Sequence, residues 1–182
     1  LELLGEAGFQ IIVKSSKRTR QLDTSSHISL LAGCTKGRGD LLFFGCLDRT
    51  LHWLNTYPDE LRQVIEEGNK GYDYLMVGRT ERALKTHPDE QLKPEIYTNE
   101  VTARLLEKDE VDVAGACRIM TKEVAAGILR FVRQEKLFFD RTVDIGDSLW
   151  PYIAHLNGES VGLIRVEGLE FETPDQYRGE IL

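Results

Sequence analysis

The sequence lacks the cysteine pattern of a disulfide-stapled or zinc-stabilised domain. Its three cysteines, Cys34, Cys46 and Cys117, are far apart and odd in number, so they show neither paired bridges nor zinc-ligand spacing. The sequence also shows no signal peptide and no apolar run long enough to span a membrane. These absences favour a reduced, cytoplasmic setting, in which the cysteines are most simply interpreted as buried, small apolar residues.

Positive charge is in the minority. The chain carries 23 Lys and Arg residues against 30 Asp and Glu residues, which gives a net charge of −7. A surface of this sign argues against nucleic acid or an anionic membrane as the main partner, although it leaves room for a local basic pocket. The sequence also has no glycine-rich phosphate loop near its start, which a nucleotidyltransferase on a similar sheet would need.

The composition that remains is that of an ordinary globular protein. The 182 residues are 41% hydrophobic and 29% charged, which predicts a single domain over residues 1–182. Apolar runs typical of strands alternate with amphipathic runs typical of helices, so we expect an α/β fold with a mainly parallel sheet flanked by helices. The expected strands lie at 9–16, 40–45, 72–83 and 160–173, and the expected helices at 21–36, from 58 to 67, at 95–107, from 121 onward and within 144–158.

The stretch 39–50, GDLLFFGCLDRT, places a carboxylate directly after an apolar run. Residues 41–44 predict a buried central strand, and the small residues that follow predict a turn that presents Asp48. Because ligands bind at the carboxyl ends of parallel strands, we expect Asp48, the charged group 79–82 and the turn 114–118 to meet at one edge of the sheet. The residues expected to line one cleft there are Asp48, Arg79, Arg118 and Asp144.

Three runs in this order resemble GT-A glycosyltransferases. The run HISLLAGCTKGRGDLLFFGCLD is similar to the segment in which a helix, a Gly-Asp pair and an apolar strand lead to an Asp-x-Asp metal motif. DVAGACRIMTKEVAAGIL resembles the acceptor-facing turn and its helix, and VDIGDSLWPYIAHLNGESVGLIRVEGLEFE resembles the acidic helix start and strand that follow. The resemblance covers about residues 9 to 172.

The resemblance implies a fold, a reaction and a cofactor. The fold would be the three-layer sandwich of nucleotide-diphospho-sugar transferases, and the reaction the transfer of a sugar from such a donor to an unknown acceptor, assisted by Mg²⁺ or Mn²⁺. The chain departs from the pattern twice. Cys46 stands at the position of the first aspartate, and the family's first strand, which holds the donor nucleotide, would precede Leu1, so an N-terminal strand is expected to be missing.

Asp48 and His87 are the candidate metal ligands. In the functional interpretation, the Asp48 carboxylate holds a divalent cation on the donor diphosphate. In the structural interpretation, Asp48 caps a helix or forms an ion pair with Arg49. His87 follows Thr86 in a proline-containing loop, and a lone histidine in such a loop is more often structural or solvent-facing than a ligand or base.

The remaining candidates are basic residues for the substrate and acidic residues for catalysis. Planar guanidinium donors suit phosphate or a sugar carboxylate, but a solvated strand end paired with Glu81 would explain the arginines equally well. A carboxylate near a helix start could orient or deprotonate the acceptor hydroxyl, although such residues are also ordinary helix caps. The substrate-binding candidates are Arg79, Arg82, Arg118 and Lys17, the last within a stretch that could equally be a surface loop, and the catalytic candidates are Asp144 and Asp147.

Two functions compete on this evidence. One is a metal-assisted glycosyltransferase, which the polar residues at several strand ends favour. The other is a catalytically degenerate relative that binds a nucleotide sugar or a protein partner, which Cys46 and the missing first strand favour. The sequence leaves the sugar, the nucleotide, the stereochemical outcome and the oligomeric state open.

Overall fold

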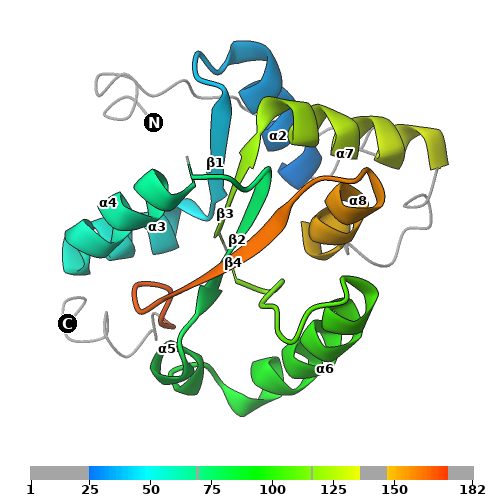
Figure 1. Ribbon diagram of the computed structural model, residues 1–182. Coiled ribbons are helices and arrows are strands. Elements are labelled where there is room, and N and C mark those ends of the chain that lie inside the picture. The colour runs from blue at the N-terminus through cyan, green and yellow to red at the C-terminus, as the bar shows by residue number, and fades with distance from the viewer. Residues whose placement is uncertain (1–24, 69, 116, 136–146, 172–182) are drawn as a thin grey trace, which may run out of the picture.

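The computed structural model describes residues 25–68, 70–115, 117–135 and 147–171. They form a sheet with helices on both faces, as Figure 1 shows, so the expected α/β class is confirmed. In chain order the elements are α2 (Ser25–Lys36), β1 (Leu41–Gly45), α3 (Leu47–Thr56), α4 (Pro58–Glu67), β2 (Tyr74–Arg79), α5 (Glu81–Lys85), α6 (Asp89–Leu105), β3 (Cys117–Thr121), α7 (Lys122–Glu135), the 3₁₀ turn η1 (Asp147–Leu149), α8 (Trp150–Leu156) and β4 (Val161–Val166). The strand expected at 9–16 lies outside the described residues.

The sheet is mixed rather than mainly parallel. Its four strands lie in the order β1-β3-β2-β4; β3 is antiparallel to both of its neighbours, and β2 is parallel to β4. The expectation of a mainly parallel sheet is therefore wrong for the described strands. The physical reason is the path of the chain after β2. Helices α5 and α6 stay at the edge where β2 ends, so the chain re-enters the sheet from that same edge and β3 runs in the opposite direction (Figure 1).

Strand β1 is an end strand of the described sheet, not the central strand that its apolar run predicted. It pairs only with β3 in the four-strand order, and its residues are half-buried or exposed, with Phe43 39% exposed. A run of large apolar residues indicates a strand, but the number of neighbours that a strand gains depends on the rest of the chain. The prediction of a strand at 40–45 is confirmed, and its predicted central, buried position is wrong.

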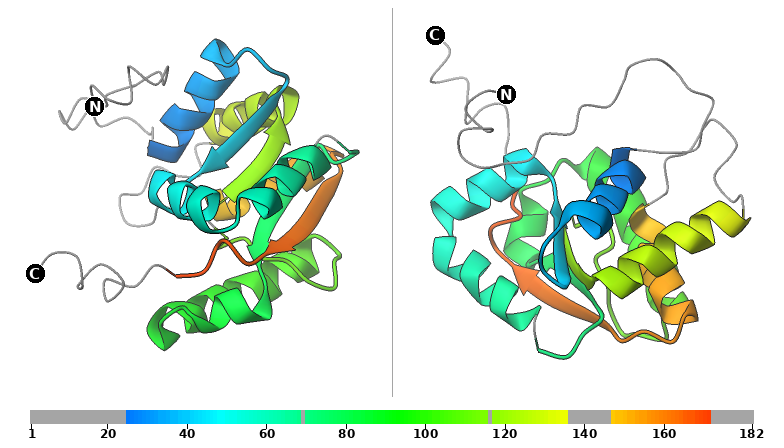
Figure 2. Two further views of the ribbon diagram at one scale, coloured as in Figure 1. Left: turned by 90° about the vertical axis from the view of Figure 1, so that its left-hand side faces the viewer. Right: turned by 90° about the horizontal axis from the view of Figure 1, so that it is seen from above.

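The two faces of β2 show how the core is divided. Side chains alternate along a strand, so Tyr74 and Met76 face α2, α7 and α8, whereas Leu75 and Val77 face α3 and α4. Figure 2 shows these helices on opposite sides of the sheet. The described residues thus form three layers.

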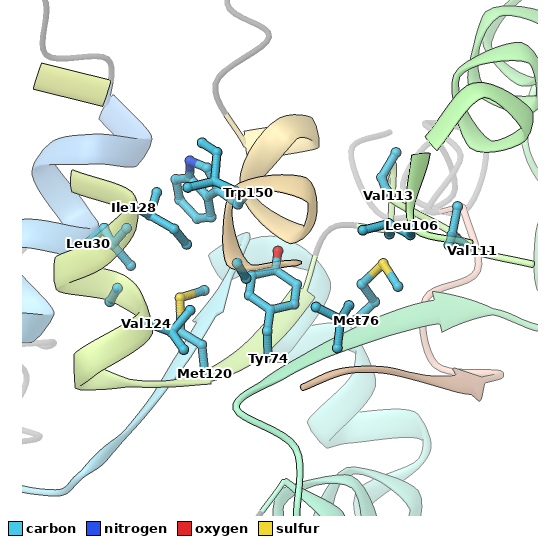
Figure 3. Close-up of a cluster of buried hydrophobic side chains, with 14 of the residues drawn as sticks. Leu30, Tyr74, Met76, Leu106, Val111, Val113, Met120, Val124, Ile128 and Trp150 are labelled. Atoms are coloured by element: carbon cyan, nitrogen blue, oxygen red, sulfur yellow. The ribbon is translucent and has the colours of Figure 1, made fainter. Parts of the chain in front are cut away.

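The larger of the two clusters lies under α2, α7 and α8, where Figure 3 shows Met120, Ile128 and Trp150 among the packed side chains. Trp150 is completely buried and its ring meets that of Phe44 edge-on, with centroids 4.9 Å apart. Burying one such apolar side chain contributes about 1.5–3 kcal/mol. This cluster therefore fixes α7 and α8 against β3 and β2.

Three local expectations about helices need correction. The whole of α3 was not expected. Helix α6 begins at Asp89, inside the stretch expected to be a loop, because Pro88 precedes the helix and the acidic pair Asp89–Glu90 stabilises its first turn. The strand expected at 72–83 ends at Arg79, and residues 81–83 belong to helix α5.

Within the described part of the chain, no helix combines the length and the apolar character needed to cross a membrane.

Candidate functional site

The edge at which β1 and β2 end is also the edge at which β3 begins. Gly45 and Val77 both lie opposite Cys117 in the two antiparallel ladders. This register brings the start of α3 and the residues after β2 to one side of the sheet. The turn that leads into β3 packs closely on β2, because a Cβ added at Gly115 would collide with the carbonyl oxygen of Val77.

Asp48 is exposed in the first turn of α3, where its negative charge stabilises the start of the helix. The residue before the helix is Cys46, whose side chain forms no capping hydrogen bond, so Asp48 is not the N-cap. No hydrogen bond or ion pair joins the Asp48 carboxylate to another described residue; Arg49 contacts His87 instead. Neither of the structural interpretations considered for Asp48, capping or pairing with Arg49, is present. Its carboxylate is available to a ligand.

The three cysteines differ in environment. Cys117 is buried, and burial raises the pKa of its thiol to about 12, so it behaves as a small apolar residue. Cys34 is partly buried. Cys46 is exposed at the start of α3, which corrects the expectation that all three are buried.

His87 is buried between α3 and α5. Its Nδ1 lies 3.0 Å from the carbonyl oxygen of Ala83, and its Nε2 lies 3.2 Å from Nη1 of Arg49. A carbonyl can only accept and a guanidinium can only donate, so the ring is neutral with the proton on Nδ1. Burial, reinforced by the charge of Arg79, lowers the pKa of His87 accordingly. Both ring nitrogens are thus engaged, and a metal would have to displace Arg49.

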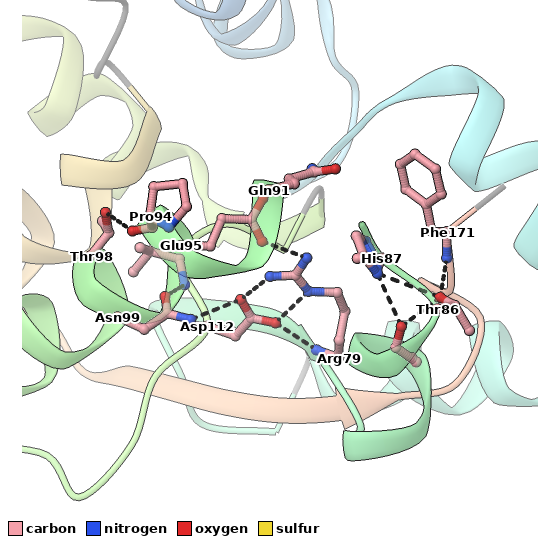
Figure 4. Close-up of polar contacts among 12 residues, drawn as sticks. Arg79, Thr86, His87, Gln91, Pro94, Glu95, Thr98, Asn99, Asp112 and Phe171 are labelled. Atoms are coloured by element: carbon pink, nitrogen blue, oxygen red, sulfur yellow. Dashed lines mark hydrogen bonds and ion pairs between the residues drawn. The ribbon is translucent and has the colours of Figure 1, made fainter. Parts of the chain in front are cut away.

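Arg79, at the end of β2, is completely buried in a polar network (Figure 4). Its backbone N–H and Nε donate to Oδ2 of Asp112 at 2.8 and 2.9 Å, and its Nη2 donates to Oδ1 at 2.8 Å. Its Nη1 lies 2.8 Å from Oε2 of Glu95 on α6. The guanidinium therefore neutralises two carboxylates of the protein itself, and it joins β2 to α6 and to the segment that leads into β3.

Asn99 extends this network. Its amide donates to Asp112 at 3.3 Å and its side-chain oxygen accepts from the backbone N–H of Val113 at 2.9 Å. Burial by itself would raise the pKa of Asp112, but the hydrogen bonds and the charge of Arg79 outweigh it and hold that pKa below its usual value. Asp112 is therefore an ionised carboxylate that positions the turn before β3.

Arg82 lies at the same end of β2 but remains half exposed. It forms ion pairs with Glu167 and, at 2.7 Å, with Glu170, and it donates to the hydroxyl of Tyr57 at 3.0 Å. Glu170 also lies 3.1 Å from Nε2 of His52 on α3. The pairing of Arg82 with Glu81 considered from the sequence is not formed, because Glu81 accepts a hydrogen bond from Lys85. Through Glu167 and Glu170, Arg82 connects α5 to the turn after β4.

Arg118 is buried on the opposite side of β3 from Cys117. Its Nη2 donates to the carbonyl oxygen of Val113 at 3.0 Å, and its guanidinium lies 5.5 Å from the centre of the Trp150 ring and 5.7 Å from that of Phe44. These are cation–π distances. Arg118 is 3% exposed, so it is held by aromatic rings rather than presented to solvent.

The other candidate residues fall largely outside the described part of the chain. Lys17 and Asp144 are outside it, and so is the side chain of Asp147, whose backbone begins η1. The predicted cleft containing Asp48, Arg79, Arg118 and Asp144 therefore remains a prediction, with Asp48 exposed and the two arginines buried.

The residues that sequence reasoning missed are the partners of the arginines: Glu95, Asn99, Asp112, Glu167 and Glu170. One signal was present in the run Val111-Asp112-Val113, where a single charge interrupts apolar residues before a small-residue turn. A buried charge of this kind requires a partner of opposite sign. The sequence does not say which arginine supplies it.

In the part of the chain that the structure describes, no group of three or more His, Cys, Asp or Glu side chains is arranged to hold a metal ion. Comparisons with protein-family models, with curated proteins and with solved structures found no match.

Proposed function

We propose that this chain is a glycosyltransferase-like domain that binds the diphosphate of a nucleotide sugar, together with Mg²⁺ or Mn²⁺, at Asp48. The observation that carries the proposal is the Asp48 carboxylate, which is exposed three residues after β1, at the edge where β2 also ends, and has no partner among the described residues. Charged side chains elsewhere at this edge, such as Arg79 and Arg82, are paired with protein carboxylates. Asp48 has no such partner among the described residues.

A single carboxylate makes a weak metal site by itself. Mg²⁺ and Mn²⁺ prefer oxygen ligands and share them with the phosphates of a bound nucleotide, so the donor would supply the ligands that the protein lacks. The metal would then stabilise the leaving diphosphate as a Lewis acid. In the transfer, the bond between the sugar and the diphosphate oxygen breaks, and its electron pair stays on the diphosphate. The acceptor oxygen forms the new bond, and its proton passes to a base, for which Asp144 and Asp147 are the candidates.

The test is isothermal calorimetry with a panel of nucleotide diphosphates and nucleotide sugars, with and without Mn²⁺. We expect Asp48→Asn to abolish the metal-dependent part of binding. Asp59→Asn is the matched control. Asp59 is the second residue of α4, as Asp48 is of α3, and both are exposed, but Asp59 has a partner in Arg62. Asp59→Asn should bind as the wild type does. Equal affinity for wild type and Asp48→Asn would contradict the proposal.

A binding module without turnover is the second candidate, and Cys46 favours it. Thiols are poor ligands for hard cations, and Cys46 is exposed two residues before Asp48. Aspartate is also a better N-cap than cysteine, so Cys46→Asp should be tolerated at this helix start. We expect Cys46→Asp to tighten Mn²⁺ binding. A wild-type protein that binds a nucleotide sugar but neither transfers nor hydrolyses it would identify the binding module.

A further inference from the structure

The outward face of α6 is unusually apolar for a surface helix. Tyr97, Val101 and Leu105 follow one another at intervals of four residues, and they are 68%, 38% and 43% exposed, respectively. The opposite face of the helix is occupied, because Glu95 and Asn99 hold the network around Arg79. Figure 1 shows α6 at the end of the molecule farthest from α2. Exposed apolar side chains in such a row indicate an interaction surface.

Two charges of opposite sign on this face lie symmetrically about Tyr97. Tyr97 is the middle residue of the 17-residue helix, and Glu90 and Arg104 lie at equal distances on either side of it. Lys93 and Glu100 flank it more closely. All of these residues share one face by helical spacing, and all are exposed. None of the four charged side chains has a hydrogen-bond or ion-pair partner among the described residues.

We propose that two copies of this chain associate through α6, with the helices antiparallel and a two-fold axis at Tyr97. That axis places Glu90 of one copy opposite Arg104 of the other, twice per dimer. It brings Lys93 beside Glu100 of the second copy on one side of the seam, and Pro94 beside Val101 on the other. The two Tyr97 rings meet at the centre, where aromatic pairs contribute most.

The charge pattern selects this arrangement over its alternatives. In a parallel pair, Glu90 would face Glu90 and Arg104 would face Arg104, and like charges across an interface are unfavourable. In the antiparallel pair Glu90 meets Arg104 and Lys93 meets Glu100, and Tyr97 meets its own copy, as a residue on a two-fold axis does. A partner protein with a different sequence would not require Glu90 and Arg104 to lie symmetrically about Tyr97. The association does not depend on the nucleotide-sugar site.

The first test is sedimentation equilibrium of the full chain over a wide concentration range. We expect a reversible dimer in the wild type. Arg104→Glu and Glu90→Arg should each raise the dimer dissociation constant at least tenfold, because each places like charges together. The double variant Glu90→Arg/Arg104→Glu should restore the dimer. Arg62→Glu, a charge reversal on the exposed face of α4, is the matched control and should leave the dimer intact.

The wild type sedimenting as a monomer throughout would overturn the proposal, and so would a dimer that the single reversals leave unchanged. If the double variant dimerises again, the single variants lost an ion pair and not their fold. Circular dichroism of each variant checks the fold independently. A double variant that folds but stays monomeric would also overturn the proposal.

The second test fixes the register. Tyr97→Cys, made in a Cys46→Ser background to remove the exposed native thiol, should form a disulfide-linked dimer under mild oxidation with oxidised glutathione. Lys93→Cys in the same background should not, because the two-fold axis separates the two copies of position 93 along the helices by about 12 Å, at 1.5 Å per residue. Crosslinking at position 93 but not at position 97 would overturn the register.

Discussion

Arg79 is the last residue of β2, and Arg82 follows it three residues later in α5. Each arginine forms ion pairs with two carboxylates, but the two differ in their exposure to solvent. Arg79 is fully buried between Asp112 and Glu95, whereas the side chain of Arg82 is 51% exposed beside Glu167 and Glu170. The first network joins β2 to α6 and to the entry of β3. The second joins α5 to the turn after β4.

The two networks differ in how far water can reach their charged groups. When a buried partner is removed, the remaining charge keeps its desolvation penalty and finds no replacement. When an exposed partner is removed, water solvates the charge that is left, and salt already screens the pair. We therefore infer that the Arg79 network is a fixed part of the fold, whereas the Arg82 network can open at little cost.

The largest expected effect is the loss of the buried guanidinium. Arg79→Met leaves Asp112 and Glu95 without a counter-charge, and breaking such a pair typically lowers the free energy of unfolding by about 3–5 kcal/mol. Urea unfolding at pH 7, followed by circular dichroism, measures this change. Arg82→Met is the matched control, with a much smaller shift of the urea midpoint. Equal shifts for the two variants would remove the distinction drawn between the networks.

A second, smaller effect is a dependence of the Arg79→Met defect on pH. In the wild type the pKa of Asp112 is held below its usual value of about 3.9, so its contribution is present above that value and is lost only as the pH falls through the lowered pKa. Without Arg79, burial raises the pKa of Asp112, and protonation then relieves the unpaired charge. We expect the stability gap between wild type and Arg79→Met to narrow from pH 7 towards pH 4.

Urea unfolding at several pH values tests this dependence. A gap that stays constant or widens on acidification would show that the defect comes from lost packing of the Arg79 side chain rather than from the uncompensated carboxylates.

The smallest expected effect concerns salt. At 1 M NaCl the screening length is about 3 Å, which weakens exposed ion pairs but hardly reaches buried ones. The difference in urea midpoint between wild type and Arg82→Met should therefore shrink in 1 M NaCl, whereas the difference for Arg79→Met should persist. A salt-sensitive Arg79 defect would mean that water reaches Asp112 in solution.

The two arginines also show how far sequence reasoning extends. Both were expected at the end of a strand. Arg79 is there, because the apolar run before it has the composition of a strand whatever surrounds it, whereas Arg82 lies in helix α5. Their burial and partners were not predictable. Asp112 lies 33 residues after Arg79 and Glu167 lies 85 residues after Arg82, so neither pair leaves a local pattern.

The same division applies to the strands. Residues 41–45 were recognised as a strand from their side chains, yet their place at the end of the sheet follows from β3 entering between β1 and β2. The direction of β3 is set by α6, which keeps the chain at one edge, and no periodicity within residues 117–121 encodes it.

By itself, the sequence determined the α/β class, the positions of β1, β2, β4 and α7, and the exposed polar character of the turn that carries Asp48. These depend on the spacing of apolar residues and on turn chemistry, which act over a few residues. The tertiary structure alone decided the mixed order of the sheet, the burial of Arg79 and Arg118, and the absence of a described partner for Asp48. Those properties depend on which distant segments meet, and contacts between distant segments are settled only when the chain packs.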